Sequence, residues 1–200
     1  MTYTVHSIFH TIQGEGFHSG KRAVFVRFAG CNLWSGREKD RAKAICKFCD
    51  TEFRGGKRYE RDALVEAICA YPTDFVVFTG GEPGLQLDNA LIRDLQHRNR
   101  YVAIESNGTV PLPDRLDWVC ISPKAETKLA VEWADEVKLV YPQPLMQPWQ
   151  ALGFVRAKHY WLSPMDGPDF KENVAAAVEL VKLDCRWRLN IQAHKVWGIA

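Results

Sequence analysis

Short runs of apolar, β-branched and aromatic residues recur along the chain and predict seven β-strands. Between several of these runs, apolar residues keep the three- or four-residue spacing of a helix face, as at Leu87, Leu91 and Leu95. Similar helical patterns cover residues 64–68 and the segment 170–181, which follows Pro168. The predicted strands lie at residues 23–28, 75–78, 101–104, 118–121, 136–140, 158–162 and 188–191.

Strands that alternate with helices, and that are apolar nearly throughout, indicate a mostly parallel α/β sheet covered by helices. About six or seven such units fit either a doubly wound sheet or an incomplete barrel. No repeat, low-complexity tract or linker divides the 200 residues, so we expect a single domain over residues 1–200. That length is short for a complete eight-unit barrel. We therefore expect a reduced, incomplete (β/α) barrel with one open side.

Polar residues follow every predicted strand, as Glu105, Ser122, Ser163 and His194 illustrate. Taken singly, such residues are equally typical of ordinary loops. The carboxyl ends of parallel strands meet at one rim, however, and active sites of α/β proteins are built there. The sequence therefore predicts one site at this rim.

Charge and hydropathy exclude several classes of protein. Lys and Arg number 26 and Asp and Glu number 24, so the net charge of +2 lacks the basic excess of a protein that binds duplex nucleic acid. No apolar run approaches the roughly 18 to 20 residues that span a bilayer. Residues 1–6 lack the basic and then apolar order of a signal peptide. We expect a cytoplasmic protein with no nucleic-acid or membrane partner.

The six cysteines fall into two groups. Cys31, Cys46 and Cys49 lie within nineteen positions, and clustered cysteines in a reducing compartment are more often metal ligands or catalysts than disulfides. Three thiolates are one short of a closed zinc site, so zinc with a histidine, an iron–sulfur cluster with one open iron, and a redox grouping all stay possible. The other three, at positions 69, 120 and 185, stand alone and are expected to be buried thiols.

The stretch Thr-Gly-Gly-Glu-Pro at residues 79–83 follows a predicted strand, about thirty residues beyond the cysteine group. Together the two motifs resemble the radical S-adenosylmethionine (SAM) superfamily. The resemblance implies a [4Fe-4S] cluster held by Cys31, Cys46 and Cys49, with SAM on the fourth iron. The usual three residues between the first two cysteines are replaced by fourteen, residues 32–45, which we read as an inserted loop.

Further segments narrow the resemblance to the 7-carboxy-7-deazaguanine synthase family, some of whose members have a lengthened first cysteine spacing. The likeness lies in residues 9–16, 27–34, 49–51, 79–83, 105–108, 122–124 and 192–200. It implies a carbon–nitrogen lyase that converts 6-carboxy-5,6,7,8-tetrahydropterin to 7-carboxy-7-deazaguanine with loss of ammonia, in the biosynthesis of 7-deazapurines such as queuosine. It also implies Mg²⁺, held in part by the hydroxyl of Thr51.

The resemblance places substrate near the chain's first polar segment, where Gln13 and Glu15 suit the amide and amine edge of a pterin. The Arg27 guanidinium suits the substrate carboxylate, with an ion pair to a protein acid as the alternative. The substrate-binding set is Ile12, Gln13, Gly14, Glu15, Arg27, Thr79, Gln192, His194 and Ala200. We expect residues 13–16 and the last residues to complete the rim, although the Ala200 end is equally consistent with a frayed tail.

The residues implied for SAM flank the third cysteine and follow later strands. They are Phe48, Cys49, Asp50, Gly81, Glu82, Ser122, Pro123, Lys124, Ser163 and Met165. For Asp50, a helix N-cap is the alternative role. The resemblance further implies a homodimer and a reductant protein for the cluster. A glycyl-radical enzyme activase and a non-catalytic zinc-binding module are the competing interpretations of the whole chain.

Overall fold

A computed structural model describes residues 1–199, and its nine strands form one continuous sheet. The strand order is β3-β1-β2-β4-β5-β6-β7-β8-β9. From β2 to β9 every neighbouring pair is parallel, whereas β1 is antiparallel to both β2 and β3. The strands are β1 (Thr2–Ile12), β2 (Arg22–Phe28), β3 (Lys57–Glu60), β4 (Phe75–Gly80), β5 (Tyr101–Ser106), β6 (Trp118–Ile121), β7 (Trp133–Tyr141), β8 (Arg156–Pro164) and β9 (Trp187–Leu189).

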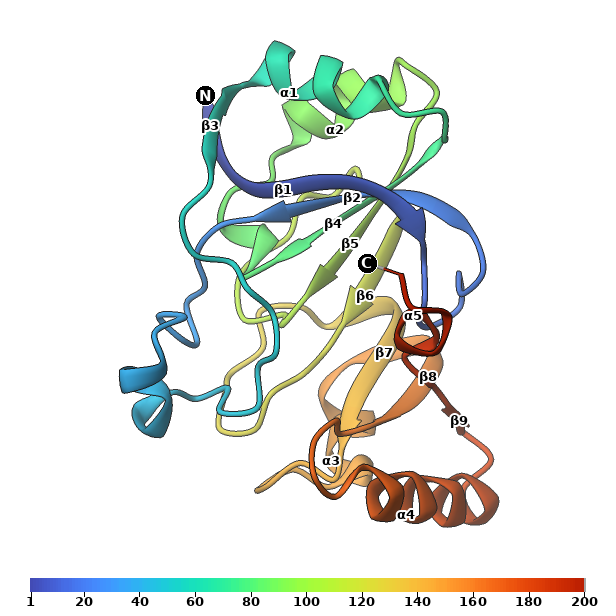
Figure 1. The fold of residues 1–200 in the computed structure, drawn as a ribbon. Coiled ribbons are helices and arrows are strands. Elements are labelled where there is room, and N and C mark those ends of the chain that lie inside the picture. The colour runs from blue at the N-terminus through green and yellow to red at the C-terminus, as the bar shows by residue number, and fades with distance from the viewer. Residues whose placement is uncertain (200) are drawn as a thin grey trace.

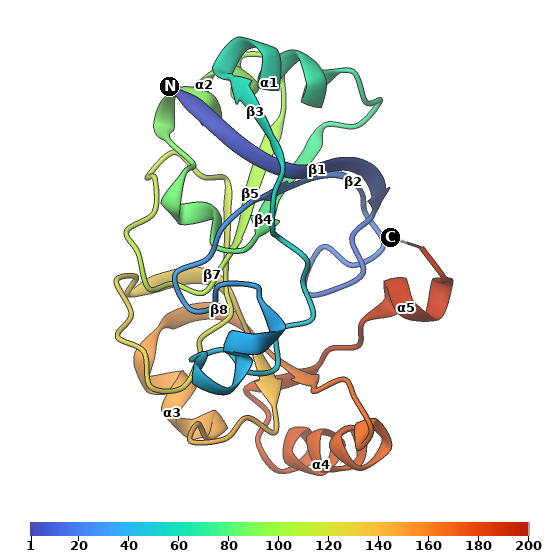
Figure 2. The same cartoon turned by 60° about the vertical axis from the view of Figure 1, so that its left-hand side comes forward.

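The sheet curves strongly but does not close, since β3 and β9 are its two edges (Figures 1 and 2). The expected incomplete, mostly parallel α/β barrel is therefore confirmed. All seven predicted strands are present, but the expected number of six to seven is too low. The sequence prediction missed β1 because a bulge between Val5 and Ser7 interrupts its alternation, and it missed β3 because that strand is short, polar and at an edge.

The four longest helices lie outside the curved sheet (Figure 1). In the described residues, 107–117 and 122–132 connect parallel strands without a helix, so helices separate several of the strands, as expected, but not all of them. The helices are α1 (Arg61–Cys69), α2 (Asn89–Gln96), α3 (Pro148–Phe154), α4 (Phe170–Leu183) and α5 (Ala193–Trp197), with two 3-10 turns, η1 (Glu38–Lys43) and η2 (Pro83–Leu85).

Alternation along the strands separates an apolar outer face from the inner face that holds the site. On β2, Val24, Val26 and Phe28 pack outward against α1 and α2, while Phe25 and Arg27 face inward. On the far half of the sheet, Leu139 and Leu162 join the outer core beneath α3 and α4. Because the sheet is curved, the inward-facing side chains of its strands surround a central space. Among residues 1–199, no helix has the length and apolar character needed to cross a bilayer.

Candidate active site

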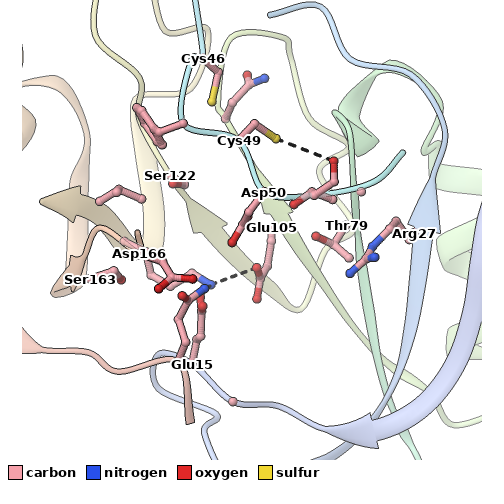
Figure 3. A pocket seen from close by; sticks show the side chains of 18 of the residues that line it. Glu15, Arg27, Cys46, Cys49, Asp50, Thr79, Glu105, Ser122, Ser163 and Asp166 are labelled. Carbon is pink, nitrogen blue, oxygen red and sulfur yellow. Dashed lines mark hydrogen bonds and ion pairs between the residues drawn. The ribbon is translucent and has the colours of Figure 1, made fainter. Parts of the chain in front are cut away.

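A cavity of about 540 Å³ occupies the inside of the open barrel. Every residue of the predicted substrate, SAM and metal sets lines it, except Glu82, Pro123 and Ala200. Ala200 lies outside the described residues. Figure 3 shows the cysteine turn on one side of the space and the Glu15 and Glu105 carboxylates on another. Residues from the two ends of the sequence therefore meet in one cavity.

The three clustered cysteines lie at the carboxyl end of the parallel strands. Cys31 follows β2, and Cys46 and Cys49 belong to a turn that ends the inserted segment. The Leu33 amide donates a hydrogen bond to the Cys31 Sγ atom over 3.4 Å, an arrangement that stabilises a thiolate ligand. No helix begins at Asp50, so the N-cap alternative for that residue is wrong.

The two thiols of the cysteine turn shift each other's pKa. A hydrogen bond from Cys46 lowers the pKa of the Cys49 thiol to about 6, and the same bond, with burial, raises the pKa of Cys46. Burial lowers the pKa of Lys124, against the attraction of both thiols. The Lys124 Nζ atom donates to the Ser122 carbonyl and hydroxyl at 2.7 Å each. A cation therefore lies beside thiols that metal binding would deprotonate.

Within residues 1–199, no three His, Cys, Asp or Glu side chains converge closely enough to hold a single metal ion. A mononuclear zinc site needs such convergence, with ligands about 2.0 to 2.3 Å from one ion. A cluster is less demanding in this respect, because each thiolate binds a different iron atom. The three thiols lining one cavity therefore fit a cluster better than the zinc alternative.

The glycine-rich motif brings the cysteine segment and β5 together. A side chain at Gly81 would overlap the Gly30 carbonyl, and the Glu82 amide donates to that same carbonyl over 2.9 Å. The Glu82 carboxylate is fully buried and accepts from Ser106 Oγ at 2.7 Å and from the Asn107 amide at 2.8 Å. Gly81 thus lines the cavity, whereas Glu82 lies behind its wall.

A buried network of charges crosses the cavity at its far end. The Lys138 Nζ atom lies 2.6 Å from Glu15 Oε2 and 2.9 Å from Glu105 Oε2. The Gln13 amide group donates to Glu105 over 2.9 Å, and its oxygen accepts from the Glu15 amide over 3.1 Å. Both ends of the Gln13 side chain are therefore hydrogen bonded to the protein. Gln13 lines the cavity, and it also orients Glu15.

Lys138 was not among the residues predicted from sequence, although one signal was available. It is a lone Lys inside β7, whose side chains are otherwise largely buried, and buried lysines are rare unless paired. Burial opposes its charge, but Glu105 and Glu15 outweigh burial and raise its pKa well above the usual value. Burial also opposes ionisation of Glu15, yet Lys138 lowers the Glu15 pKa.

The segment after β1 enters the barrel from the end opposite to the one we predicted. Phe17 stacks on Trp118 with ring centroids 4.9 Å apart, and His18 contacts Phe75 at 4.8 Å and Trp118 at 4.6 Å. Phe75 and Trp118 are the first residues of β4 and β6. Because β1 runs antiparallel to β2, residues 13–16 form a floor at the amino ends of the strands, and the expectation that they complete the rim is wrong.

Arg27 and Thr79 face the cavity from neighbouring positions on β2 and β4 (Figure 3). The Arg27 Nε atom is buried and has no hydrogen-bond partner, and within residues 1–199 no carboxylate lies within 4.0 Å of the guanidinium. The ion-pair alternative for Arg27 is therefore not observed. A partly buried cation that lines the cavity without a counter-ion is suited to an anionic ligand.

Helix α5 covers the open side of the barrel beside the floor. The Ala193 amide donates to the Gly14 carbonyl over 3.0 Å, and His194 lies so close to Gly14 that a side chain there would clash with it. Lys195 reaches across to Asp50 at 3.4 Å and Asp166 at 2.5 Å. The end of the chain thus contacts both the floor and the cysteine side.

Comparison with known proteins identifies the family. No family model matches the chain. The 7-carboxy-7-deazaguanine synthase of Bradyrhizobium diazoefficiens is 49% identical, and that of Bordetella pertussis is 47% identical, each over the full length of both chains. The chain belongs to the 7-carboxy-7-deazaguanine synthase family. This membership decides against the activase and the zinc-binding module.

The 7-carboxy-7-deazaguanine synthase fold is also recognisable in a solved structure. The crystal structure of QueE from Escherichia coli superimposes with a TM-score of 0.74, covering 97% of this chain and 95% of that one. The two sequences are 23% identical, so this likeness concerns the fold alone. An open, mostly parallel sheet is therefore common to both proteins.

Proposed function

We propose that this chain converts 6-carboxy-5,6,7,8-tetrahydropterin to 7-carboxy-7-deazaguanine with loss of ammonia, as a radical SAM enzyme of 7-deazapurine biosynthesis. One observation carries the proposal beyond family membership. A single cavity joins three thiols, a guanidinium without a carboxylate partner and a carboxylate floor, each suited to a different part of that reaction.

Cys31, Cys46 and Cys49 are the residues that would hold the [4Fe-4S] cluster. Bound together, the cluster and SAM supply the radical chemistry that removes and returns a substrate hydrogen atom. The residues proposed to hold SAM are Phe48, Asp50, Gly81, Ser122, Lys124, Ser163 and Met165, all of which line the cavity. Glu82 and Pro123 do not line it, so we propose that they act by placing the neighbouring backbone.

The protein's own groups bind and orient the pterin. The Arg27 fork is proposed to bind the substrate carboxylate, with Thr79 beside it. At the floor, the ionised Glu15 carboxylate accepts hydrogen bonds from the amino group and the ring N–H groups of the pterin. The same end of the pterin is enclosed by Ile12, Gln13, Gly14, Gln192 and His194. We also propose that Thr51 supplies one oxygen to Mg²⁺, with water and substrate completing its six ligands.

Anaerobic turnover tests this proposal. The protein is reconstituted with iron and sulfide and incubated with the carboxytetrahydropterin, SAM, Mg²⁺ and a chemical reductant. We expect 7-carboxy-7-deazaguanine and ammonia in equal amounts. Absence of both products from protein with an intact cluster would contradict the proposed function.

Three finer features belong to the same proposal. A reductant protein for the cluster and a homodimeric state are what the family resemblance implies, and light scattering of the purified protein tests the second. A cytoplasmic location would keep the thiols reduced, and none of the six cysteines forms a disulfide in the described chain.

A further inference from the structure

The long insertion between Cys31 and Cys46 folds back onto the cysteine turn. Its 3-10 turn η1 lies beyond the carboxyl ends of the strands (Figure 1). From η1, the Arg41 Nη1 atom donates hydrogen bonds to the carbonyl oxygens of Lys47, at 2.8 Å, and Cys49, at 3.0 Å. One guanidinium nitrogen therefore joins two backbone groups of the turn that carries two of the proposed cluster ligands.

Arg41 is itself held in place by two other residues of the insertion. Its Nε atom donates to both carboxylate oxygens of Glu38, each at 2.8 Å. Its guanidinium carbon lies 4.1 Å from the ring centroid of Trp34, which is buried and packs edge-on against Phe53. Ion pairing on one side and stacking on the other leave the Arg41 side chain little rotational freedom.

The cysteine turn has few other fixed points. Residues 47 and 48 form a turn, and in the described chain no backbone–backbone hydrogen bond ties residues 46–52 to another segment. Immediately before the turn, the Ile45 amide donates to the Leu33 carbonyl, and after it the Phe53 carbonyl accepts from the Gly30 amide. Between these anchors, the Lys47 and Cys49 carbonyls depend on Arg41.

We propose that Arg41 is a positioning residue that fixes the Cys46–Cys49 turn in the geometry that binds the cluster. The inference rests on the proposed function, because it takes these cysteines as cluster ligands. It also gives the insertion a role, since Glu38, Trp34 and Arg41 act together on the turn. Arg41 does not line the main cavity, so it has no contact with substrate or SAM there.

Two substitutions separate the geometry of Arg41 from its charge. Arg41→Gln removes the charge, and Arg41→Lys keeps it but cannot bridge two carbonyls while pairing with Glu38 and stacking on Trp34. Arg37 provides the matched control. It belongs to the same insertion, is exposed, and its side chain has no hydrogen bond or ion pair within residues 1–199. Arg37→Gln therefore removes the same charge from the same loop.

The measurements are iron and sulfide per chain after identical anaerobic reconstitution, and the rate of iron loss to a chelator. Since outer residues that orient metal ligands typically change metal affinity about 10- to 100-fold, we expect both Arg41 variants to lose iron at least about 10-fold faster than the wild type. Arg37→Gln should match the wild type. Hydrogen exchange of the metal-free proteins should show faster exchange of the residue 46–51 amides in both Arg41 variants.

The outcomes distinguish the two proposals. If the wild type takes up no iron and sulfide, the proposed function fails. If the wild type assembles a cluster and both Arg41 variants lose iron at the wild-type rate, the positioning role is overturned. It is also overturned if Arg41→Lys loses iron at the wild-type rate while Arg41→Gln does not, because charge alone would then be sufficient. Glu38→Gln tests the same role even if the Arg41 variants misfold. It keeps the Arg41 guanidinium but weakens the ion pair that holds it, so its rate of iron loss should lie between those of the wild type and the Arg41 variants.

Discussion

The Lys138 ammonium lies 2.6 Å from one oxygen of Glu15, and the two side chains come from opposite parts of the sequence. The same ammonium lies 2.9 Å from Glu105, and Lys138 is 7% exposed. One cation between two carboxylates leaves this group of three side chains with one net negative charge. That charge suits a ligand edge rich in N–H donors, which is the edge a pterin presents.

Replacing Lys138 should destabilise the protein strongly. Lys138→Met leaves two partly buried carboxylates facing each other, and removal of one partner from a fully buried ion pair typically costs about 3 to 5 kcal/mol, which sets the upper end of the expected loss. Lys182→Met is the control, because the Lys182–Glu179 pair has a similar N–O distance of 2.8 Å but its side chains are 65% and 66% exposed, and exposed pairs contribute about 1 kcal/mol or less. Urea unfolding at neutral pH measures both. Equal losses in the two variants would contradict the importance of the floor network.

The contribution of this network should depend on pH in a specified direction. Lys138 lowers the Glu15 pKa below 4.5, so the stabilisation is complete above that pH and is lost as the pH falls through the lower folded value. The Lys138 pKa is raised well above 10.5, so its contribution is present below 10.5 and is lost only at more alkaline pH. The difference in unfolding free energy between wild type and Lys138→Met should therefore be constant near neutrality and shrink in acid. A difference that grows below pH 4.5 would be the opposite result.

The cysteine assignment predicts a clear division among the thiols. Cys31→Ala, Cys46→Ala and Cys49→Ala should each abolish cluster binding and SAM cleavage. Cys120→Ala and Cys185→Ala should retain both, because neither residue lines the cavity. Cys120 is buried in β6 as expected, whereas Cys185 is exposed after α4, so the expectation that it is buried is wrong. Iron and sulfide analysis and the release of methionine from SAM measure the outcome. Similar losses in all five variants would refute the ligand set.

Much of the fold was predictable because local sequence determines it. The parallel strands are apolar runs bounded by polar turns, and each of the seven was placed from that pattern. Cys31 and Cys46 were grouped by composition and short separation, and both line the cavity. An inserted loop was also predicted, but the contact of its Arg41 with the cysteine turn was not, because a charged residue in a polar stretch is typical of solvent exposure.

The rest depends on tertiary contacts that local patterns do not contain. The position of residues 13–16 follows from the direction of β1, a strand whose bulge hides its alternation. The partners of Lys138 lie more than thirty and more than one hundred residues away, at Glu105 and Glu15. Glu82 was expected to contact SAM, yet its carboxylate accepts hydrogen bonds from Ser106 and from the Asn107 amide behind the cavity wall.

Arg27 should favour binding of a pterin that carries a carboxylate over one that lacks it. Arg27→Gln removes a charged guanidinium from the cavity wall, and hydrogen bonds to charged groups contribute about 1.5 to 3 kcal/mol each. We expect KM for the carboxytetrahydropterin to rise at least about 10-fold, which corresponds to about 1.4 kcal/mol. Binding of a tetrahydropterin without the carboxylate, measured by calorimetry, should be nearly unchanged. An equal loss for both ligands would show that Arg27 supports the cavity rather than the carboxylate.

Thr51 should affect the magnesium dependence of turnover and leave the cluster intact. Its side chain faces the cavity directly after the cysteine turn, and its carbonyl accepts from Cys49 Sγ at 4.0 Å. Thr51→Val keeps the shape and the backbone but removes the hydroxyl, so the Mg²⁺ concentration for half-maximal activity should rise about 10-fold, as expected for one lost polar interaction. Thr51→Ser restores the hydroxyl and should return the titration toward the wild type. Iron content should be equal in all three proteins. If Thr51→Val and the wild type show the same magnesium titration, the hydroxyl is not a ligand, and the ion must be held by substrate and water alone.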